Sequence, residues 1–424
     1  MTSADREQTT SSSPPESRAT VPLWRRAWEL LIGPADAPAA APPRMTVLTI
    51  LMIAGLMAVW RVTIGVFSDV IARVNVIEDW PDDINQFELL RYSVRWDSGW
   101  YLTIAREGYE HVPDGQSSIA FFPMFPSSMR FLDQFIPGSD ILAGLILVHL
   151  ALFAALIYIY KLVQIDYPDI VAWRTLFFTL MFPASFFFSA LYTESYLLLG
   201  FAGTLYHARR GQFLLAGAFG IFTGLTKLIG IVLVIPVGLE LIKQGHLRFS
   251  REHLCPWLGT ALVPMGGFAY LASIHIRYGD FREYFEAQGH WYRETFSPEP
   301  FVAFLNVLRR EPPAEFPYYP ANITPLHGMF TVQDVGALLI FLAAGVYLWF
   351  RVRPSYGALV LAGAMVPALS GTPLALNRYM AILFPVFILI ATIRWEPLRL
   401  AVAIIFGLGL MFTTYLFVNG LWAG

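Results

Sequence analysis

One carboxylate, Asp97, stands in a strongly aromatic stretch of the chain, RWDSGWYLTIAREGY at residues 95–109. Trp96 and Trp100 flank it, and the equally aromatic IAFFPMFP follows at residues 119–126. An acid in such surroundings, just outside a long apolar segment, suggests chemistry at the boundary between water and lipid. Because Asp is a favoured helix N-cap, capping of the helix that follows is the alternative role for this side chain.

Further polar side chains stand where other apolar segments end. They are Glu194 in SALYTES, Lys227 in LTKLIG, His290 in QGHWYRE and the tripeptide Asn377, Arg378 and Tyr379. Each has a structural alternative, since Glu194 could cap a helix, Lys227 could snorkel and Arg378 could anchor at the interface. A carboxylate and two cations that converge on an aromatic cleft would suit an anionic lipid substrate.

The chemistry that needs these residue types is sugar transfer from a lipid monophosphate. Such a donor requires apolar grooves for its chain, a cation for its phosphate and a base for the proton of the acceptor hydroxyl. A phosphate monoester is already a good leaving group, so one carboxylate is enough, and Asp97 is the predicted base. The residues assigned to donor and substrate binding are Arg95, Trp96, Trp100, Tyr101, Glu194, Lys227, His290, Asn377, Arg378 and Tyr379.

Composition sets the class of protein. Of 424 residues, 56% are hydrophobic and 14% are charged, with 34 Phe and 12 Trp. These values indicate an all-α polytopic membrane protein. A net charge of -2 without a basic tract argues against nucleic-acid binding. The single cysteine, Cys255, excludes a disulfide framework or a cysteine-built metal site within the chain.

The apolar segments predict about eleven transmembrane helices, each near the length that a bilayer requires. They span 45–68, 139–162, 170–189, 191–207, 212–226, 228–243, 254–276, 334–351, 355–371, 378–394 and 398–420. The stretch 212–243 fits either two short helices with a break near Lys227 or one long tilted helix. Residues 45–424 are therefore predicted to form one transmembrane catalytic domain.

The N-terminal region, residues 1–44, is predicted to be a disordered or interfacial cytoplasmic extension. Residues 1–22 are polar and rich in Ser, Thr and Pro, whereas PADAPAAAPP at 34–43 is a stiff linker. No signal peptide is evident, because the first apolar run begins only at Met45.

The distribution of Lys and Arg predicts the orientation in the membrane. With a cytoplasmic N-terminus, the inner connections carry Arg25, Arg26, Lys161, Arg174, Arg209, Arg210, Lys243, Arg248, Arg251, Arg351, Arg353, Arg394 and Arg399. Both long loops, 69–138 and 277–333, then face the non-cytoplasmic side. A multi-pass protein of a bacterial plasma membrane is expected, or of the endoplasmic reticulum membrane if the source is eukaryotic.

The stretches quoted above also resemble a known family. RWDSGWYLTIAREGY with IAFFPMFP is similar to the first lumenal loop of the PIG-V family, the GPI mannosyltransferase II type and its prokaryotic relatives. The resemblance continues through FPASFFFSALYTESYLLL, FGIFTGLTKLIGIVLVIP and NRYMAILFPVF, and so covers most of the chain from Arg91 to Phe387. Where relatives commonly carry Arg-Ser-Asn-Gly, this chain has Thr226-Lys227-Leu228-Ile229-Gly230.

The resemblance implies a GT-C glycosyltransferase fold and an inverting transfer of mannose from a polyprenyl-phosphate donor on the non-cytoplasmic face. Asp97 matches the position of the family's acid in loop one, which is taken as the general base. The expected partners are the lipid-linked donor, a lipid or glycan acceptor and membrane lipids. Alternatives are transfer of another polyprenyl-linked sugar, lipid or solute transport, and a scaffold role in a glycolipid-assembly complex.

No cofactor is expected, and a divalent metal is left open. The acids of EDWPDD, Glu78, Asp79, Asp82 and Asp83, indicate a solvated loop broken by Pro more than a pair of metal ligands. A uniformly apolar midplane and the absence of a visible repeat argue against a channel or carrier.

Overall fold

The computed structural model describes residues 31–75, 91–136, 139–248, 250–291, 293, 297, 301–302, 305, 309, 324–370 and 375–421. The chain divides into two compact units, Met1–Pro34 and Ala35–Gly424. The predicted extension up to residue 30 and the four acids of EDWPDD lie outside the described residues. Everything below concerns the second unit.

The regular secondary structure of the described residues in this unit is helical, with one isolated bridge between Ser297 and Ser370 and no strand. The predicted all-α class is therefore confirmed for them. The first helices are α2 (Val47–Asn75), α3 (Asp97–Arg106), α4 (Met124–Asp133), α5 (Asp140–Val163), α6 (Asp169–Met181), α7 (Glu194–Arg209), α8 (Phe213–Thr226) and α9 (Val234–Lys243). The remaining ones are α10 (Leu254–Leu262), α11 (Met265–Tyr278), α12 (Glu283–Gly289), α14 (Thr324–Arg351), α15 (Pro354–Ala368), α16 (Leu376–Ala381), α17 (Pro385–Ala391) and α18 (Glu396–Val418).

The number of helices long enough to span a bilayer differs from the prediction. In the described part of the chain, four helices are long and apolar enough to cross a membrane, namely α2, α5, α14 and α18. A fifth span results if the bent pair that ends in α10 and α11, with 51° between its halves, is counted as one. The other apolar segments form helices that are shorter than a full span, so the predicted count of about eleven is not confirmed.

Prolines and one polar residue account for the short helices. Pro183 follows the end of α6, Pro264 separates α10 from α11 and Pro385 begins α17. Proline lacks the N–H that continues a helical ladder, so each of these positions ends or restarts a helix. The ambiguous stretch 212–243 is two helices, because α8 ends before the extended Lys227 and a 3₁₀ segment, Leu228–Leu233, precedes α9.

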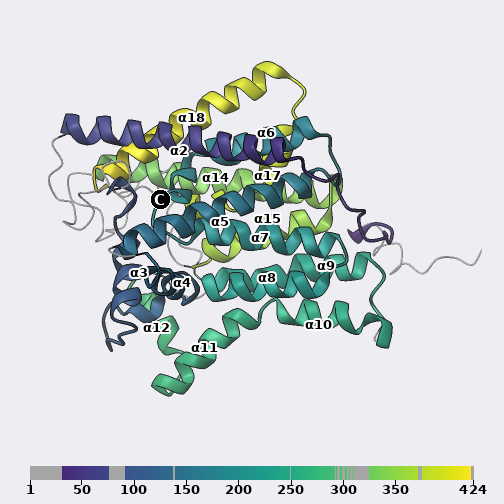
Figure 1. The fold of residues 1–424 in the computed structure, drawn as a ribbon, viewed down its shortest axis with the longest axis horizontal. Helices are drawn as coiled ribbons and strands as arrows, with labels where there is room; N and C mark the ends of the chain where they lie inside the picture. The colour runs from purple at the N-terminus through teal and green to yellow at the C-terminus, as the bar shows by residue number, and fades with distance from the viewer. Residues whose placement is uncertain are drawn as a thin grey trace, which may run out of the picture. The chain divides into compact units, whose positions relative to one another are not determined.

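Helix α7 lies at the centre of the packing, between α5 on one side and α8 on the other (Figure 1). Nearly all of its side chains are buried. Glu194 is its first residue and Arg209 its last, so the helix carries a charge at each end, about 22 Å apart at 1.5 Å per residue. The two charged ends define two separate ionic clusters, and the apolar core lies between them.

The cluster at the Arg209 end connects the linker to the helices. The Arg353 guanidinium donates to both Glu240 carboxylate oxygens, at 2.6 and 2.7 Å. Asp36 accepts from Arg353 and pairs with Lys243, each at 3.1 Å. Glu240 is completely buried, and a buried carboxylate is stable only when it is paired in this way. Arg209, Lys243 and Arg353, three members of the predicted inner set, thus lie together at one end of α7.

Candidate active site

Four elements that are distant in sequence meet at the Glu194 end of α7. They contribute Asp97, the first residue of α3, Glu194 itself, Lys227 at the end of α8, and Arg378 in the short α16. Arg378 and Glu194 are 5% and 2% exposed, whereas Asp97 and Lys227 retain 21% and 22% of their side-chain accessibility. The cluster is thus buried around Arg378 and Glu194 and accessible to solvent at Asp97 and Lys227.

Arg378 joins the two carboxylates. Its Nη1 donates to Asp97 Oδ2 at 3.0 Å, and its Nε donates to Glu194 Oε1 at 3.0 Å. Its Nη2 lies 2.9 Å from the same Glu194 oxygen. The guanidinium carbon also stands 5.0 Å from the ring centre of Phe187 and 4.8 Å from that of Tyr192. Aromatic faces and two anions therefore hold the guanidinium in one position.

A second pair of cations faces Tyr379, the neighbour of Arg378. Lys227 Nζ lies 4.6 Å from the centre of the Tyr379 ring and 3.7 Å from Glu194 Oε1. The Arg293 guanidinium carbon lies 5.5 Å from the same ring. Arg378 and Lys227 thus balance the two carboxylates, and Arg293, on the same tyrosine ring as Lys227, adds one positive charge. Such an excess favours an anionic group, and phosphate is one that both Arg and Lys bind.

Glu194 is also notable for the oxygen that it does not use. Oε1 receives both cations, but Oε2 is buried and has no hydrogen-bond partner among the described residues. A buried carboxylate oxygen without a donor is costly, because it has lost water without gaining a replacement. This oxygen is available to accept a hydrogen bond from a hydroxyl group of a bound molecule.

The backbone around Asp97 has an unusual conformation. Trp96 has φ 53° and ψ −116°, in a region that residues with a side chain rarely occupy. The phenol of Tyr192 braces this turn, since it donates to the Arg95 carbonyl at 3.1 Å and accepts from the Asp97 N–H at 3.3 Å. Trp96 is the N-cap of α3, and the Asp97 carboxylate pairs with Arg378. The capping alternative is therefore not what the structure contains.

Aromatic side chains form a wall beside Asp97. Trp100 stacks on Phe121 at 5.6 Å between ring centres and meets Trp291 edge-on at 5.3 Å. Tyr101 lies edge-on to Phe121, and its hydroxyl is 3.4 Å from Thr193 Oγ1. Burial raises the pKa of Tyr101 well above its usual value, and the negative charge of Asp97 adds to that rise. The phenol therefore stays neutral and can act as a hydrogen-bond donor.

Not every predicted residue joins this cluster. His290 is exposed at the C-terminal end of α12, and no contact of the ionic cluster includes it. Asn377 is buried, and its backbone hydrogen-bonds to the carboxylate of Asp334, which indicates a role in holding α16 against α14. Arg95 contributes its backbone carbonyl to the brace on Tyr192, while Trp96 is 44% exposed beside the base.

Three contributors were not among the predicted site residues. Arg293, Tyr192 and Trp291 each touch a predicted residue, through Tyr379, Arg378 and Trp100 respectively. Tyr192 and Trp291 stand within two residues of Glu194 and His290, so the same motifs already contained the signal. Arg293 belongs to the QGHWYRE motif as well, but only the structure shows that it reaches Tyr379.

Metal binding has no candidate in the described part of the chain, where no group of three His, Cys, Asp or Glu side chains could hold an ion. Both carboxylates at the site contact Arg378. The expectation that no cofactor is needed stays a prediction.

Comparisons with solved structures find low similarity over most of the chain. A crystal structure of ArnT from Cupriavidus metallidurans bound to undecaprenyl phosphate matches at 15% identity and a TM-score of 0.47, over 85% of this chain and 63% of that protein. The apo state of the same protein matches at 16% identity and a TM-score of 0.46, over 84% and 62%. The apo oligosaccharyltransferase of Archaeoglobus fulgidus matches at 13% identity and a TM-score of 0.41, over 86% and 56%.

This chain therefore spans less than two thirds of the length of these proteins. No protein-family model matches the sequence. Comparison with curated protein sequences finds no match either. Because the structural similarities are low, we infer a function from the geometry of the ionic cluster and from the motifs that contribute to it.

Proposed function

We propose that this chain is a membrane glycosyltransferase of the GT-C type that transfers mannose from a polyprenyl-phosphate donor to a hydroxyl of a lipid or glycan acceptor. The observation that carries the proposal is the position of Arg378 between Asp97 and Glu194, with Lys227 and Arg293 beside it. This arrangement places a base next to a surplus of positive charge. The choice of mannose rests on the resemblance to the PIG-V family.

The reaction follows from these side chains. Asp97 takes the proton of the acceptor hydroxyl, whose oxygen attacks the anomeric carbon of the donor sugar. The bond between that carbon and the phosphate oxygen breaks at the same time, and the polyprenyl phosphate leaves with the electron pair. Lys227, Arg378 and Arg293 neutralise its developing charge. A single displacement inverts the anomeric centre, and no general acid is required.

The ion pair between Arg378 and Asp97 adds an order of events. While Arg378 donates to Asp97 Oδ2, that oxygen is engaged in an ion pair and is not free to accept the proton of the acceptor hydroxyl. The phosphodiester of the donor carries one negative charge, and when it binds the guanidinium it competes for the same N–H groups. Binding of the donor would thereby free Asp97 to act as a base, so we expect the donor to bind before the acceptor.

The proposal is tested by transfer from synthetic polyprenyl-phosphate mannose with purified protein in lipid vesicles. We expect wild type to consume the donor and Asp97→Asn to consume none, while Asp114→Asn, which changes an exposed acid, keeps normal activity. If the protein consumes polyprenyl-phosphate glucose or arabinose but not the mannose donor, the proposed donor sugar is wrong and the proposed reaction class holds. If no donor is consumed and solute or lipid flux survives in Asp97→Asn, the protein is a transporter.

The separation of the two ionic clusters along α7 supports a proposal that they lie on opposite sides of the membrane. We place the Asp97 cluster on the non-cytoplasmic face of a bacterial plasma membrane, as the positive-inside pattern predicts. In a Cys255→Ser background, a membrane-impermeant maleimide should label Asp114→Cys in intact cells and should label Arg248→Cys only after lysis. The reverse pattern would invert the topology.

A further inference from the structure

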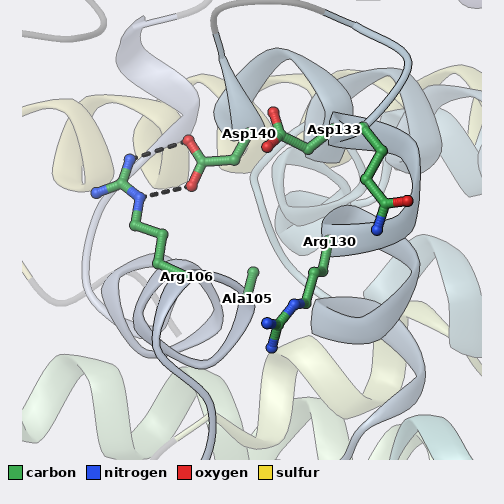
Figure 2. A pocket seen from close by; sticks show the side chains of 6 residues that line it. Ala105, Arg106, Arg130, Asp133 and Asp140 are labelled. Carbon is green, nitrogen blue, oxygen red and sulfur yellow. Dashed lines mark hydrogen bonds and ion pairs between the residues drawn. The ribbon is translucent and has the colours of Figure 1, made fainter.

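A small polar pocket lies at the far end of α3 from Asp97. Its volume is about 260 Å³, and it is lined by Ala105, Arg106, Arg130, Asp133, Gln134 and Asp140 (Figure 2). These residues come from the end of α3, from the last turn of α4 and its following residue, and from the start of α5. Asp97 and Ala105 are eight residues apart on one helix, which corresponds to about 12 Å along its axis. The pocket is therefore separate from the candidate active site.

One ion pair makes a rigid wall of this pocket. Arg106 donates to both oxygens of Asp140, at 2.6 and 2.9 Å, in a bidentate geometry (Figure 2). Asp140 also accepts from the N–H of Ile141 at 2.9 Å, which fixes it at the start of α5. A bidentate pair satisfies the charges of both partners and holds them in place.

The residues from α4 carry charges without such a partner, with Arg130 exposed and Asp133 half-buried. Among the described residues, Arg130 and Asp133 form no ion pair with each other or with any other side chain. Gln134 adds an amide beside them. The pocket thus offers one cation and one anion within three residues of α4, together with a group that can donate or accept hydrogen bonds. A ligand that carries both charges would match this arrangement.

Two exposed phenylalanines lie at the C-terminal end of α4. Phe131, in its last turn, and Phe135, in the turn that follows the helix, are 63% and 66% exposed and contact each other at 5.3 Å between ring centres. The buried face of the same helix contains Phe125 and Met129. An exposed aromatic pair beside polar residues at a helix end is typical of a segment that lies at the surface of a bilayer.

We propose that the pocket binds the headgroup of a zwitterionic phospholipid that carries a primary ammonium group. Arg130 contacts the phosphate, Asp133 and the Gln134 carbonyl accept from the ammonium, and Phe131 and Phe135 enter the acyl-chain boundary beside it. A primary ammonium donates three hydrogen bonds that a carboxylate and an amide can accept. A quaternary ammonium has no such donors and is instead recognised by aromatic faces, which do not line this pocket. An anionic headgroup carries a phosphate for Arg130 but no cation that could pair with Asp133.

Binding of short-chain phospholipids to the delipidated full-length protein in detergent tests this proposal. Native mass spectrometry or thermophoresis would compare phosphatidylethanolamine, phosphatidylcholine and phosphatidylglycerol. We expect phosphatidylethanolamine to bind about tenfold more tightly than the other two, and Arg130→Gln and Asp133→Asn each to remove about tenfold of that affinity. Asp133→Asn should not weaken phosphatidylglycerol. The matched controls Arg282→Gln and Asp114→Asn change exposed charges away from the pocket and should bind like wild type.

Each outcome decides the matter. Equal affinity for all three lipids, or wild-type affinity in both pocket variants, would overturn the proposal. Stronger binding of a neutral glycolipid than of phosphatidylethanolamine would overturn it in favour of a sugar-binding pocket. Thermal unfolding of each variant checks that the fold is intact, and a pocket variant that unfolds at the wild-type temperature yet loses the lipid supports the proposed contacts.

Discussion

Asp97 Oδ2 lies 3.0 Å from Nη1 of Arg378, although 281 residues separate the two in the chain. Each side chain has a reason to be where it is: α3 begins at Asp97 after a strained turn, and α16 places Arg378 between two carboxylates. In this pairing the base and a phosphate-binding cation inhibit each other until a substrate separates them. The pairing is therefore the feature on which the kinetics of the enzyme should depend.

Removal of the Asp97 charge should improve binding of the leaving group while it stops transfer. Asp97→Asn releases Arg378 from a competing anion, which corresponds to about 1 kcal/mol or roughly fivefold in affinity for polyprenyl phosphate. Isothermal titration with the lipid phosphate in vesicles measures this change. Weaker binding in Asp97→Asn than in wild type would show that Asp97 supports the site and does not compete for Arg378.

Lys227 should contribute to donor affinity without contributing to stability. It is 22% exposed, and its contact with Glu194 is long, at 3.7 Å. Loss of one charge-assisted contact to phosphate corresponds to about 1.5–3 kcal/mol, so Lys227→Gln should raise the KM for donor at least about tenfold. The unfolding temperature should stay near that of wild type, and Lys227→Arg should restore most of the affinity. An unchanged KM in Lys227→Gln would remove Lys227 from the donor site.

Gly230 should be needed for the position of Lys227. A Cβ at Gly230 would lie 2.6 Å from the Gly224 nitrogen and 2.6 Å from the Thr223 carbonyl carbon, both backbone atoms that cannot rotate away. Gly230→Ala should therefore push the 3₁₀ segment away from the last turn of α8. We expect this change to destabilise the protein by about 1–3 kcal/mol and to weaken donor binding. Gly238→Ala on α9 is the matched control, because nothing lies within 4 Å of its Cβ. Equal melting temperatures for the two variants would contradict this account of the break.

The linker should detach from the helices in acid. Although burial raises the pKa of Asp36, the hydrogen bond and charge of Lys243 and the charge of Arg353 outweigh it and leave the pKa below its usual value. The stabilisation is thus complete above the unfolded pKa of about 3.9 and disappears as the pH falls through the lower, folded value. The Asp36 and Ala39 amides donate to the Lys243 and Arg209 carbonyls. Their protection from hydrogen exchange, relative to the intrinsic rate at the same pH, should fall below about pH 4.

A control variant separates this effect from general acid unfolding. Asp36→Asn should exchange quickly at neutral pH already and should lose most of the dependence on pH. If its amides are as protected as those of wild type at pH 7, the carboxylate does not hold the linker.

Local features of the sequence determined the class of protein and the candidates for its chemistry. An apolar run is a local property of the sequence, so the helices lie close to the predicted segments. The break at Lys227 was one of two predicted arrangements. Asp97, Glu194, Lys227 and Arg378 were all predicted because a charge at the end of an apolar segment is conspicuous in sequence alone.

Only the tertiary structure decided how these elements combine. Which of the many cations faces Asp97 depends on contacts between segments hundreds of residues apart, and no periodicity records them. The same holds for Arg293, for the exposed His290 and for the pocket between α3, α4 and α5. The number of full spans also depended on where Pro and Lys227 interrupt a helix. Apolar composition predicts that a segment is buried, but it does not determine the length of the helix that the segment forms.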